Sequence, residues 1–169
     1  ENLMSRLWLK KQLNALELYT VDVIYGRRAG AGSAVYGGFL GFETSREERD
    51  WAGAPTIITG DLMGNDLPTF GNYGDNSRGT LRASAVTGAR LDGFTVCAGN
   101  ADGTSGGRST GGGIDVRSGS NLDIANCRFY ANKCSFGGGA LYVNNSTVRF
   151  ENCAFEGNEQ LATPRKLER

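Results

Sequence analysis

The chain has 169 residues, of which 26 are glycine, 3 are proline and none is histidine. Glycine is about twice as frequent as the usual 7%, but collagen is excluded because it needs glycine at every third position and abundant proline. A helix bundle is disfavoured, since each interior glycine costs about 1 kcal/mol of helix propensity. The absence of histidine removes the most common general base and metal ligand. The length suits a single domain.

The charges of the chain are balanced, because Lys and Arg together number 18 and so do Asp and Glu. No basic face is indicated, and we expect no nucleic-acid partner. No apolar run reaches about 18 residues, so we expect no membrane-spanning segment. The first residues lack the basic, apolar and small order of a signal peptide. The four cysteines form no C-x-x-C motif, which without histidine argues against a zinc site.

Residues 1–25 contain no glycine, and we interpret them as an amino-terminal cap. Leucines near helical spacing predict a short amphipathic α-helix over about residues 3–16, which would cover the open end of a sheet. These leucines are Leu3, Leu7, Leu13 and Leu16. Alternation of residue types over 18–25 predicts a strand after the helix.

Residues 26–78 contain two strand patterns and one short helix pattern. The strands are predicted at 34–40 and 56–59, which are rich in β-branched and aromatic residues. Between them, Ser45 followed by Glu48 fits a capping box and predicts a helix of one or two turns. A polar loop rich in Asp, Asn and Gly then extends from residue 61 to residue 77.

A repeat dominates the second half of the chain. The segment 122–132 aligns with 148–158 at an offset of 26 residues, and 91–96 aligns with 124–129 at an offset of 33. The additional residues fall in the loop 102–110. A constant register with length changes confined to loops is typical of a stacked solenoid.

Inward and outward positions alternate within each repeat, and the alternation breaks where the chain turns a corner. The parity changes just before Cys127, which places a corner at Asn126, and the same break recurs at Asn152. Asparagine tolerates the left-handed backbone of a corner, and its amide can bond to neighbouring rungs. Asn132 and Asn158 are expected to mark the next corner in the same way.

Short strands that each pair with a copy one turn later form a parallel β-helix. Inward residues one rung apart would stack in its core, Cys127 on Cys153 and Phe129 on Phe155. We therefore predict an all-β fold, with a parallel β-helix of about four or five rungs over residues 26–158. The amino-terminal cap precedes it, and residues 159–169 form a tail.

The repeat motifs resemble those of known families. GGGI at 111–114 and GGAL at 138–141, each followed by a C-x-F-x-x-N motif, resemble the repeats of polymorphic outer-membrane proteins. Three upstream segments are similar to bacterial choice-of-anchor proteins, namely VYGGFLGFETSREERDW at 35–51, PTIITGDL at 55–62 and LDGFTVCAGN at 91–100. The resemblance implies a right-handed, pectate-lyase-like β-helix and an extracellular or cell-surface location.

Three interpretations of function remain open. The favoured one is a non-catalytic binding or structural module of an exported bacterial surface protein, with a polysaccharide or another surface protein as its partner. The second is a carbohydrate-active enzyme, either a polysaccharide lyase or a hydrolase, and the third is a truncated fragment without independent activity. No concentrated carboxylate pair of the kind used in glycoside hydrolysis is visible, so we assign no catalytic residue.

The enzyme interpretation would depend on outward charged residues, which are the available candidates for acid–base chemistry. They include Asp92, Asp115, Asp123, Arg90, Arg117, Arg128 and Arg149. Cross-strand ion pairs, such as Arg128 with Glu156 and Arg149 with Asp123, are the simpler interpretation.

The polar loop contains the candidate metal ligands. Asp61, Asn65, Asp66 and Asp75 offer hard oxygen atoms of the kind that calcium prefers, although the spacing is not that of an EF-hand. A solvated loop with Asx turns is the simpler interpretation. We expect no other cofactor.

Cysteines, tyrosines and the last rung give three further expectations. Cys97 and Cys134 are the better candidates for a disulfide, since in-register stacking sets Cys127 and Cys153 too far apart for usual geometry. Outward tyrosines could form a sugar-stacking or protein-contact surface, and they are Tyr36, Tyr73, Tyr130 and Tyr142. The open last rung is expected to be covered by Leu161 and Leu167, or to be buried in a contact between two copies of the chain.

Overall fold

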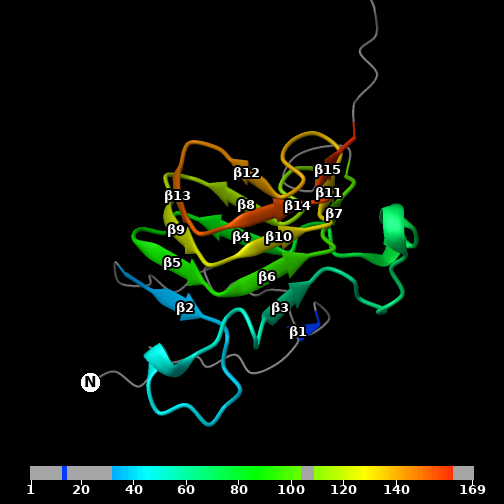
Figure 1. Cartoon of the computed structure of the whole chain (residues 1–169). Helices are drawn as coiled ribbons and strands as arrows, with labels where there is room; N and C mark the ends of the chain where they lie inside the picture. The colour runs from blue at the N-terminus through cyan, green and yellow to red at the C-terminus, as the bar shows by residue number, and fades with distance from the viewer. Residues whose placement is uncertain (1–12, 15–31, 104–108, 162–169) are drawn as a thin grey trace, which may run out of the picture.

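The computed structural model describes residues 13–14, 32–103 and 109–161, and their strands form four parallel sheets (Figure 1). We name each sheet after a central strand. The β6 sheet has the order β1-β3-β6-β10-β14, and the β9 sheet has the order β13-β9-β5-β2. The β8 sheet has the order β12-β8-β4, and the β11 sheet has the order β15-β11-β7.

The strands are short, and successive strands along the chain belong to different sheets. The β6 sheet contains β1 (Leu13–Asn14), β3 (Thr56–Thr59), β6 (Phe94–Cys97), β10 (Arg128–Tyr130) and β14 (Ala154–Glu156). The β9 sheet contains β2 (Ala34–Tyr36), β5 (Ala89–Asp92), β9 (Asn121–Ala125) and β13 (Thr147–Glu151). The β8 sheet contains β4 (Leu81–Ser84), β8 (Ile114–Arg117) and β12 (Leu141–Val143). The β11 sheet contains β7 (Asn100–Ala101), β11 (Lys133–Cys134) and β15 (Glu159–Gln160).

Each complete turn of the coil contributes one strand to each sheet, which makes the fold a parallel β-helix. The turns β4–β7, β8–β11 and β12–β15 are stacked on β2 and β3, with β1 at the edge of the β6 sheet. The predicted offsets are confirmed, because Phe129 pairs with Phe155 on the next rung and with Val96 on the previous one. The all-β solenoid predicted from the repeat is thus the observed architecture.

The core is built from side chains that stack in register along the axis. On the β6 sheet, Ile58, Val96 and Phe129 lie on three consecutive rungs and are buried. The ring of Phe155 continues this stack, with its centroid 5.1 Å from that of Phe129 and the two planes 7° apart. The stack joins a single apolar cluster that includes Leu91, Ile114 and other inward residues of the remaining sheets.

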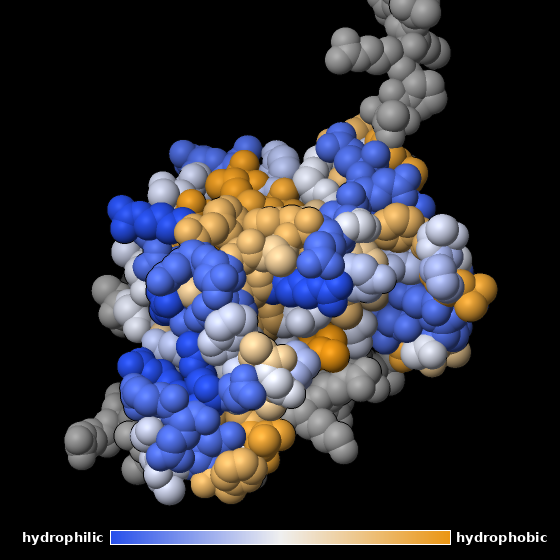
Figure 2. Space-filling model, in the orientation of Figure 1, coloured by the Kyte–Doolittle hydropathy of each residue, from blue (hydrophilic) through white to orange (hydrophobic). Residues whose placement is uncertain are grey.

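The last rung leaves its inward positions exposed. Phe155 is 48% exposed, whereas Phe129 one rung earlier is fully buried. Val143 and Phe150 are exposed in the same way, and Figure 2 shows apolar residues gathered at this end, over β12–β14. Leu161 is also exposed, so it does not close the end, and Leu167 lies outside the described residues. Burial of this end between two copies stays a prediction.

The corners after β9 and β13 have the left-handed backbone that their asparagines predict. Asn126 and Asn152 both have φ of 50°. The second corner is displaced by one residue from the prediction, because the positive φ falls on Ala131 and Gly157 rather than on the asparagines that follow them. A corner therefore needs one residue with positive φ, and that residue is not always the one with the informative side chain.

Asn132 instead forms a hydrogen-bonded ladder through the core. Its side chain is fully buried, and its Nδ2 donates to the carbonyl of Val96 on the previous rung at 2.9 Å. Its Oδ1 accepts from the backbone N–H of Gly99, while Asn158 Oδ1 accepts from the backbone N–H of Asn132. The buried amide of Asn132 is therefore satisfied by the rungs on either side of it.

Two predictions for the first half of the chain need correction. Leu13 and Asn14 form β1 and pair with the edge of β3, so the predicted helix over 3–16 is wrong at these positions. The edge of β3 presents unpaired backbone groups, which a strand satisfies and a helix does not. The remainder of that helix and the predicted strand over 18–25 lie outside the described residues.

The second correction concerns the segment between β2 and β3. The predicted strand over 34–40 ends at Tyr36, and the short helix is a 3-10 helix at Arg46–Glu48. Ser45 makes no side-chain cap, and Glu48 instead accepts hydrogen bonds from the backbone N–H and hydroxyl of Thr44. The capping interaction thus exists one residue earlier than predicted. Two further 3-10 helices, Pro68–Phe70 and Tyr73–Asp75, lie in the polar loop.

The core stack predicts unequal effects for two chemically identical substitutions. Phe129→Ala leaves a cavity at a fully buried position and is expected to lower the free energy of unfolding by about 3–5 kcal/mol. Phe155→Ala removes a half-exposed ring and should cost less than half as much. Urea unfolding of both variants measures the difference, and equal losses would contradict the assignment of inward positions.

Candidate functional site

A cavity of about 550 Å³ opens between the polar loop and the corner at which β3, β6 and β10 end. The parallel register places Thr59, Cys97 and Tyr130 opposite one another on consecutive rungs, and all three line the cavity. The loop, which lies beside the ends of β3 and β6 in Figure 1, supplies the facing wall. The cavity thus lies where a long insertion crosses the regular coil.

Asp61 organises the start of this loop. Its carboxylate accepts hydrogen bonds from the backbone N–H groups of Gly64 at 2.7 Å and of Asn65 and Asp66 at 3.2 Å. Both carboxylate oxygens take part, so the side chain is engaged in holding the turn.

Tyr73 anchors the far end of the loop. It was predicted to face outward, but it is buried, and its hydroxyl donates to the carbonyl of Ala131 at 2.9 Å. Burial raises the pKa of Tyr73 above its usual range, so the phenol stays protonated at neutral pH. The side chain therefore ties the loop to the corner after β10.

Aromatic rings form the more open part of the cavity. Phe70 packs edge-to-face against Tyr73, with ring centroids 5.0 Å apart. Tyr130 is 44% exposed, and the guanidinium carbon of Arg128 lies 4.5 Å from the centroid of its ring. Phe70 and Tyr130 thus both line the cavity, and each has a cationic group over its ring.

Asp66 is the acidic group of the cavity that is not used to hold the turn. Burial raises its pKa, and the neighbouring carboxylates Asp61 and Asp75 raise it further, while a hydrogen bond from Asn76 opposes these effects. Burial also raises the pKa of Cys97, which favours a neutral thiol over a reactive thiolate. No described Lys or Arg is among the lining residues, but Arg128 lies over the ring of Tyr130 and Lys133 Nζ lies 5.3 Å from the ring centroid of Phe70.

The structure divides the predicted metal ligands. Asp61 holds the turn, and Asn65 lies in an exposed part of the loop, where its backbone carbonyl accepts a bond from Asn72. Asp66 and Asp75 interact through their charges, since Asp75 raises the pKa of Asp66. Within the described ranges, no three Asp, Glu, Cys or His side chains are grouped so that they could hold a metal ion.

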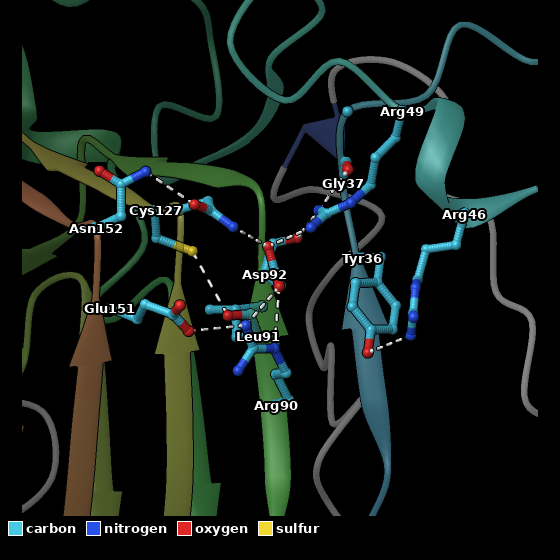
Figure 3. Close-up of polar contacts among 12 residues, drawn as sticks. Tyr36, Gly37, Arg46, Arg49, Arg90, Leu91, Asp92, Cys127, Glu151 and Asn152 are labelled. Atoms are coloured by element: carbon cyan, nitrogen blue, oxygen red, sulfur yellow. Dashed lines mark hydrogen bonds and ion pairs between the residues drawn. The ribbon is translucent and has the colours of Figure 1, made fainter.

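The charged residues considered for the enzyme interpretation are mostly engaged in ion pairs. Figure 3 shows Arg49 reaching from the segment after β2 to Asp92, where its Nη2 lies 2.7 Å from Oδ1. Asn126 Nδ2 donates to the same oxygen at 2.8 Å, and Arg90 Nε donates to the other at 3.0 Å. Burial alone would raise the pKa of Asp92, but the bonds from Asn126, Arg49 and Arg90 outweigh it and lower the pKa.

Other pairs in the same set follow from the register. Asp115 is paired with Arg82 and Arg117, with N–O distances of 3.2 and 2.6 Å. The predicted pair of Arg128 with Glu156 is present at 2.6 Å. Arg149 and Asp123 lie opposite each other as predicted, but they form no ion pair in the structure.

The cysteines are free, and the predicted pairing of Cys97 with Cys134 is wrong in the structure. Cys97 ends β6 and lies opposite Tyr130, whereas Cys134 lies opposite Ala101 in a different sheet. The corner at Ala98 separates the two positions. Cys127 and Cys153 contact backbone carbonyls of the preceding rungs, with sulfur–oxygen distances of 3.7 Å to Leu91 and 3.4 Å to Ile124.

The sequence pattern did not reveal Phe70 or Tyr130 as parts of one cavity. Tyr130 was identified only as an outward residue, and Phe70 lies in a loop without periodicity. The available signal was the insertion itself, because a long polar segment between two strands of a solenoid must lie against the coil.

The Asp92 network predicts a pH-dependent contribution to stability. At pH 7, Asp92→Asn should lower the free energy of unfolding by about 3 kcal/mol, because it leaves the nearly buried Arg49 without a counter-charge. The folded pKa lies below the unfolded value, so this advantage is present above about pH 4 and is lost as the pH falls through the folded value. Urea unfolding between pH 2.5 and 7 measures the free energy of unfolding of both proteins, and the difference between wild type and Asp92→Asn should become smaller as the pH falls.

An exposed ion pair provides the control for that series. Asp102 pairs with Arg78 at 3.3 Å, and both side chains are largely exposed. Asp102→Asn should cost less than about 1 kcal/mol at any pH. A difference between wild type and Asp92→Asn that grows on acidification would contradict the proposed role of Asp92.

Sequence comparisons agree with the observed architecture. No described helix is long and apolar enough to cross a membrane. No curated protein and no solved structure shows significant similarity to the chain. The family model described as "right handed beta helix region" matches residues 73–163, which is more than half of the chain. The chain therefore belongs to the right-handed β-helix family.

Proposed function

We propose that the chain is a non-catalytic β-helical module that binds a neutral saccharide in the cavity beside Tyr130. The observation that carries this proposal is the lining, in which the rings of Phe70 and Tyr130 and the carboxyl group of Asp66 border one space. The volume of about 550 Å³ lies within the range of small-molecule sites.

The chemistry of the lining favours a saccharide. The apolar face of a pyranose ring can stack on Tyr130 or Phe70, while its hydroxyl groups can donate to Asp66 Oδ2 and the Thr59 hydroxyl. An acidic sugar would meet the carboxylates of Asp61 and Asp66, while of the two nearby cations Arg128 is already paired with Glu156 and Lys133 lies over the ring of Phe70. A neutral ligand therefore fits better than a uronate.

The cavity supports binding rather than hydrolysis or elimination. Hydrolysis of a glycoside usually needs two available carboxyl groups, and Asp61 is engaged with three backbone N–H groups. The hydroxyl of Tyr73 donates a hydrogen bond to a backbone carbonyl, and Cys97 is favoured as a neutral thiol. Neither side chain therefore offers an evident base or nucleophile.

The proposal extends to the location of the protein. The motifs at 35–51, 55–62 and 91–100 are similar to those of exported surface proteins. A module that binds glycans would act at a bacterial surface, as an adhesion or cell-wall contact. The support for this part is the resemblance of the motifs.

Two outward tyrosines allow a matched test. Tyr130→Ala should weaken the binding of the best ligand in a panel of neutral and uronic oligosaccharides by about fivefold or more, because it removes the stacking face. Tyr142→Ala is the control, since Tyr142 also lies beside an arginine, Arg117, but does not line the cavity. Titration calorimetry measures the affinities.

An assay for released reducing and unsaturated ends on the same panel tests the non-catalytic part. We expect binding without release. Turnover of any oligosaccharide would overturn that part, and equal weakening by the Tyr130 and Tyr142 variants would overturn the assignment of the cavity.

A further inference from the structure

Unpartnered oxygen atoms are concentrated at one place in the described part of the chain. Among the described residues, five buried side-chain polar atoms have no hydrogen-bond partner. Four of the five belong to the polar loop and to strand β7. These four are Asp66 Oδ1, Asp75 Oδ2, Asn76 Oδ1 and Asn100 Oδ1. All four are acceptors, so this place lacks donors or positive charge rather than acceptors.

Hydrogen bonds connect Asn76 with Asp66 and bring Asn76 and Asn100 to one carbonyl group. Asn76 Nδ2 donates to Asp66 Oδ2 at 2.8 Å, which places its amide against that carboxylate. The backbone N–H of Asn76 and the Nδ2 of Asn100 both donate to the carbonyl of Tyr73, at 3.3 and 2.8 Å. Asp75 directly precedes Asn76. The loop and β7 therefore meet at Asn76 and Asn100, and the charge of Asp75 acts on Asp66.

The two amides are nearly inaccessible to solvent. Asn76 is 7% exposed and Asn100 is 6% exposed. Their Nδ2 atoms are engaged, with Asn76 donating to Ala98 as well as to Asp66, while both Oδ1 atoms have no donor. A buried acceptor without a partner is destabilising, so two such amides beside two carboxylates point to a ligand that supplies positive charge.

The charge of the cluster points to the same kind of ligand. Neither Asp66 nor Asp75 forms an ion pair with a described Lys or Arg. Arg78 is close in sequence, but it pairs with Asp102. Two carboxylates near each other with no counter-charge are expected to repel, and a cation between them would remove that cost.

We propose that Asp66, Asp75, Asn76 and Asn100 bind a calcium ion, with water completing its shell. Calcium takes six to eight oxygen ligands from carboxylates, amide carbonyls and water in flexible geometry, whereas magnesium demands a small octahedral site. The set differs from the one predicted from the sequence, because Asn76 and Asn100 replace Asp61 and Asn65. This inference goes beyond the saccharide proposal and does not depend on it.

A calcium ion at this place would join the loop to the coil. Asp66 belongs to the wall of the cavity, whereas Asn100 belongs to β7. The ion would therefore fix the loop wall against the solenoid. Its proposed ligands include only two carboxylates, which favours a weak affinity. We expect an affinity in the range of extracellular calcium modules, with a Kd of about 0.1–1 mM.

The test uses the 169-residue chain, treated with chelator, and calcium chloride alone. At about 10 mM calcium, the melting temperature should rise by about 3–6 °C, and titration calorimetry should show one site. Magnesium chloride at the same concentration should give a clearly smaller rise. Absence of calcium binding to the folded wild-type chain would overturn the proposal and would indicate that buried water satisfies these oxygens.

The variant Asp75→Asn distinguishes calcium binding by Asp75 from a purely structural role of its side chain. In chelator, this variant should melt at the same temperature as wild type or higher, because it removes the repulsion between Asp75 and Asp66. Its gain with calcium should be largely lost. Asp66→Asn should behave in the same way.

Asp123→Asn is the matched control, since Asp123 also has an unpartnered buried oxygen but lies in β9, outside the cluster. Its gain with calcium should equal that of wild type. A full calcium gain in Asp75→Asn would overturn the assignment of the ligands. Saccharide binding is measured separately, so failure of one proposal does not imply failure of the other.

Discussion

The in-register stacking of inward side chains is the constraint on which the whole fold depends. Ile58, Val96 and Phe129 occupy the same position on three rungs, so each strand must return to the same place with the same parity. Corners therefore need a residue with positive φ at a fixed distance from the stack, as at Asn126 and Ala131. Polar ladders follow from the same constraint, because equivalent side chains lie one rung apart and can bond to each other.

Features that are not periodic are placed by this regular coil. The outward ladder of Thr59, Cys97 and Tyr130 forms one wall of the cavity only because the register aligns three segments that are distant in sequence. The loop that faces it is held by its own bonds, at Asp61 and at the hydroxyl of Tyr73. The regular wall and the separately braced loop together enclose the cavity on the side of the solenoid.

Sequence reasoning reached the repeat because its residues carry the constraint directly. Matched Cys, Phe and Asn residues report strand register, and the corner at Asn126 follows from their parity. The corner at Ala131 gave no such signal, since alanine is not a typical residue for positive φ. The pairing of Leu13 and Asn14 with β3 was missed because helical spacing of leucines does not report an open backbone edge. Tyr73 was misplaced because its burial depends on how a non-periodic loop folds back.

The offsets between paired strands differ along the chain, although the stacking does not. Arg90 pairs with Ala34, which lies 56 residues earlier, while Phe94 pairs with Thr56 at a separation of 38 and Phe155 with Phe129 at 26. Connections of very different length therefore leave the coil unchanged. Insertion and deletion at the corners can alter a binding surface without altering the scaffold, so recognition in such a chain can diversify in evolution independently of folding.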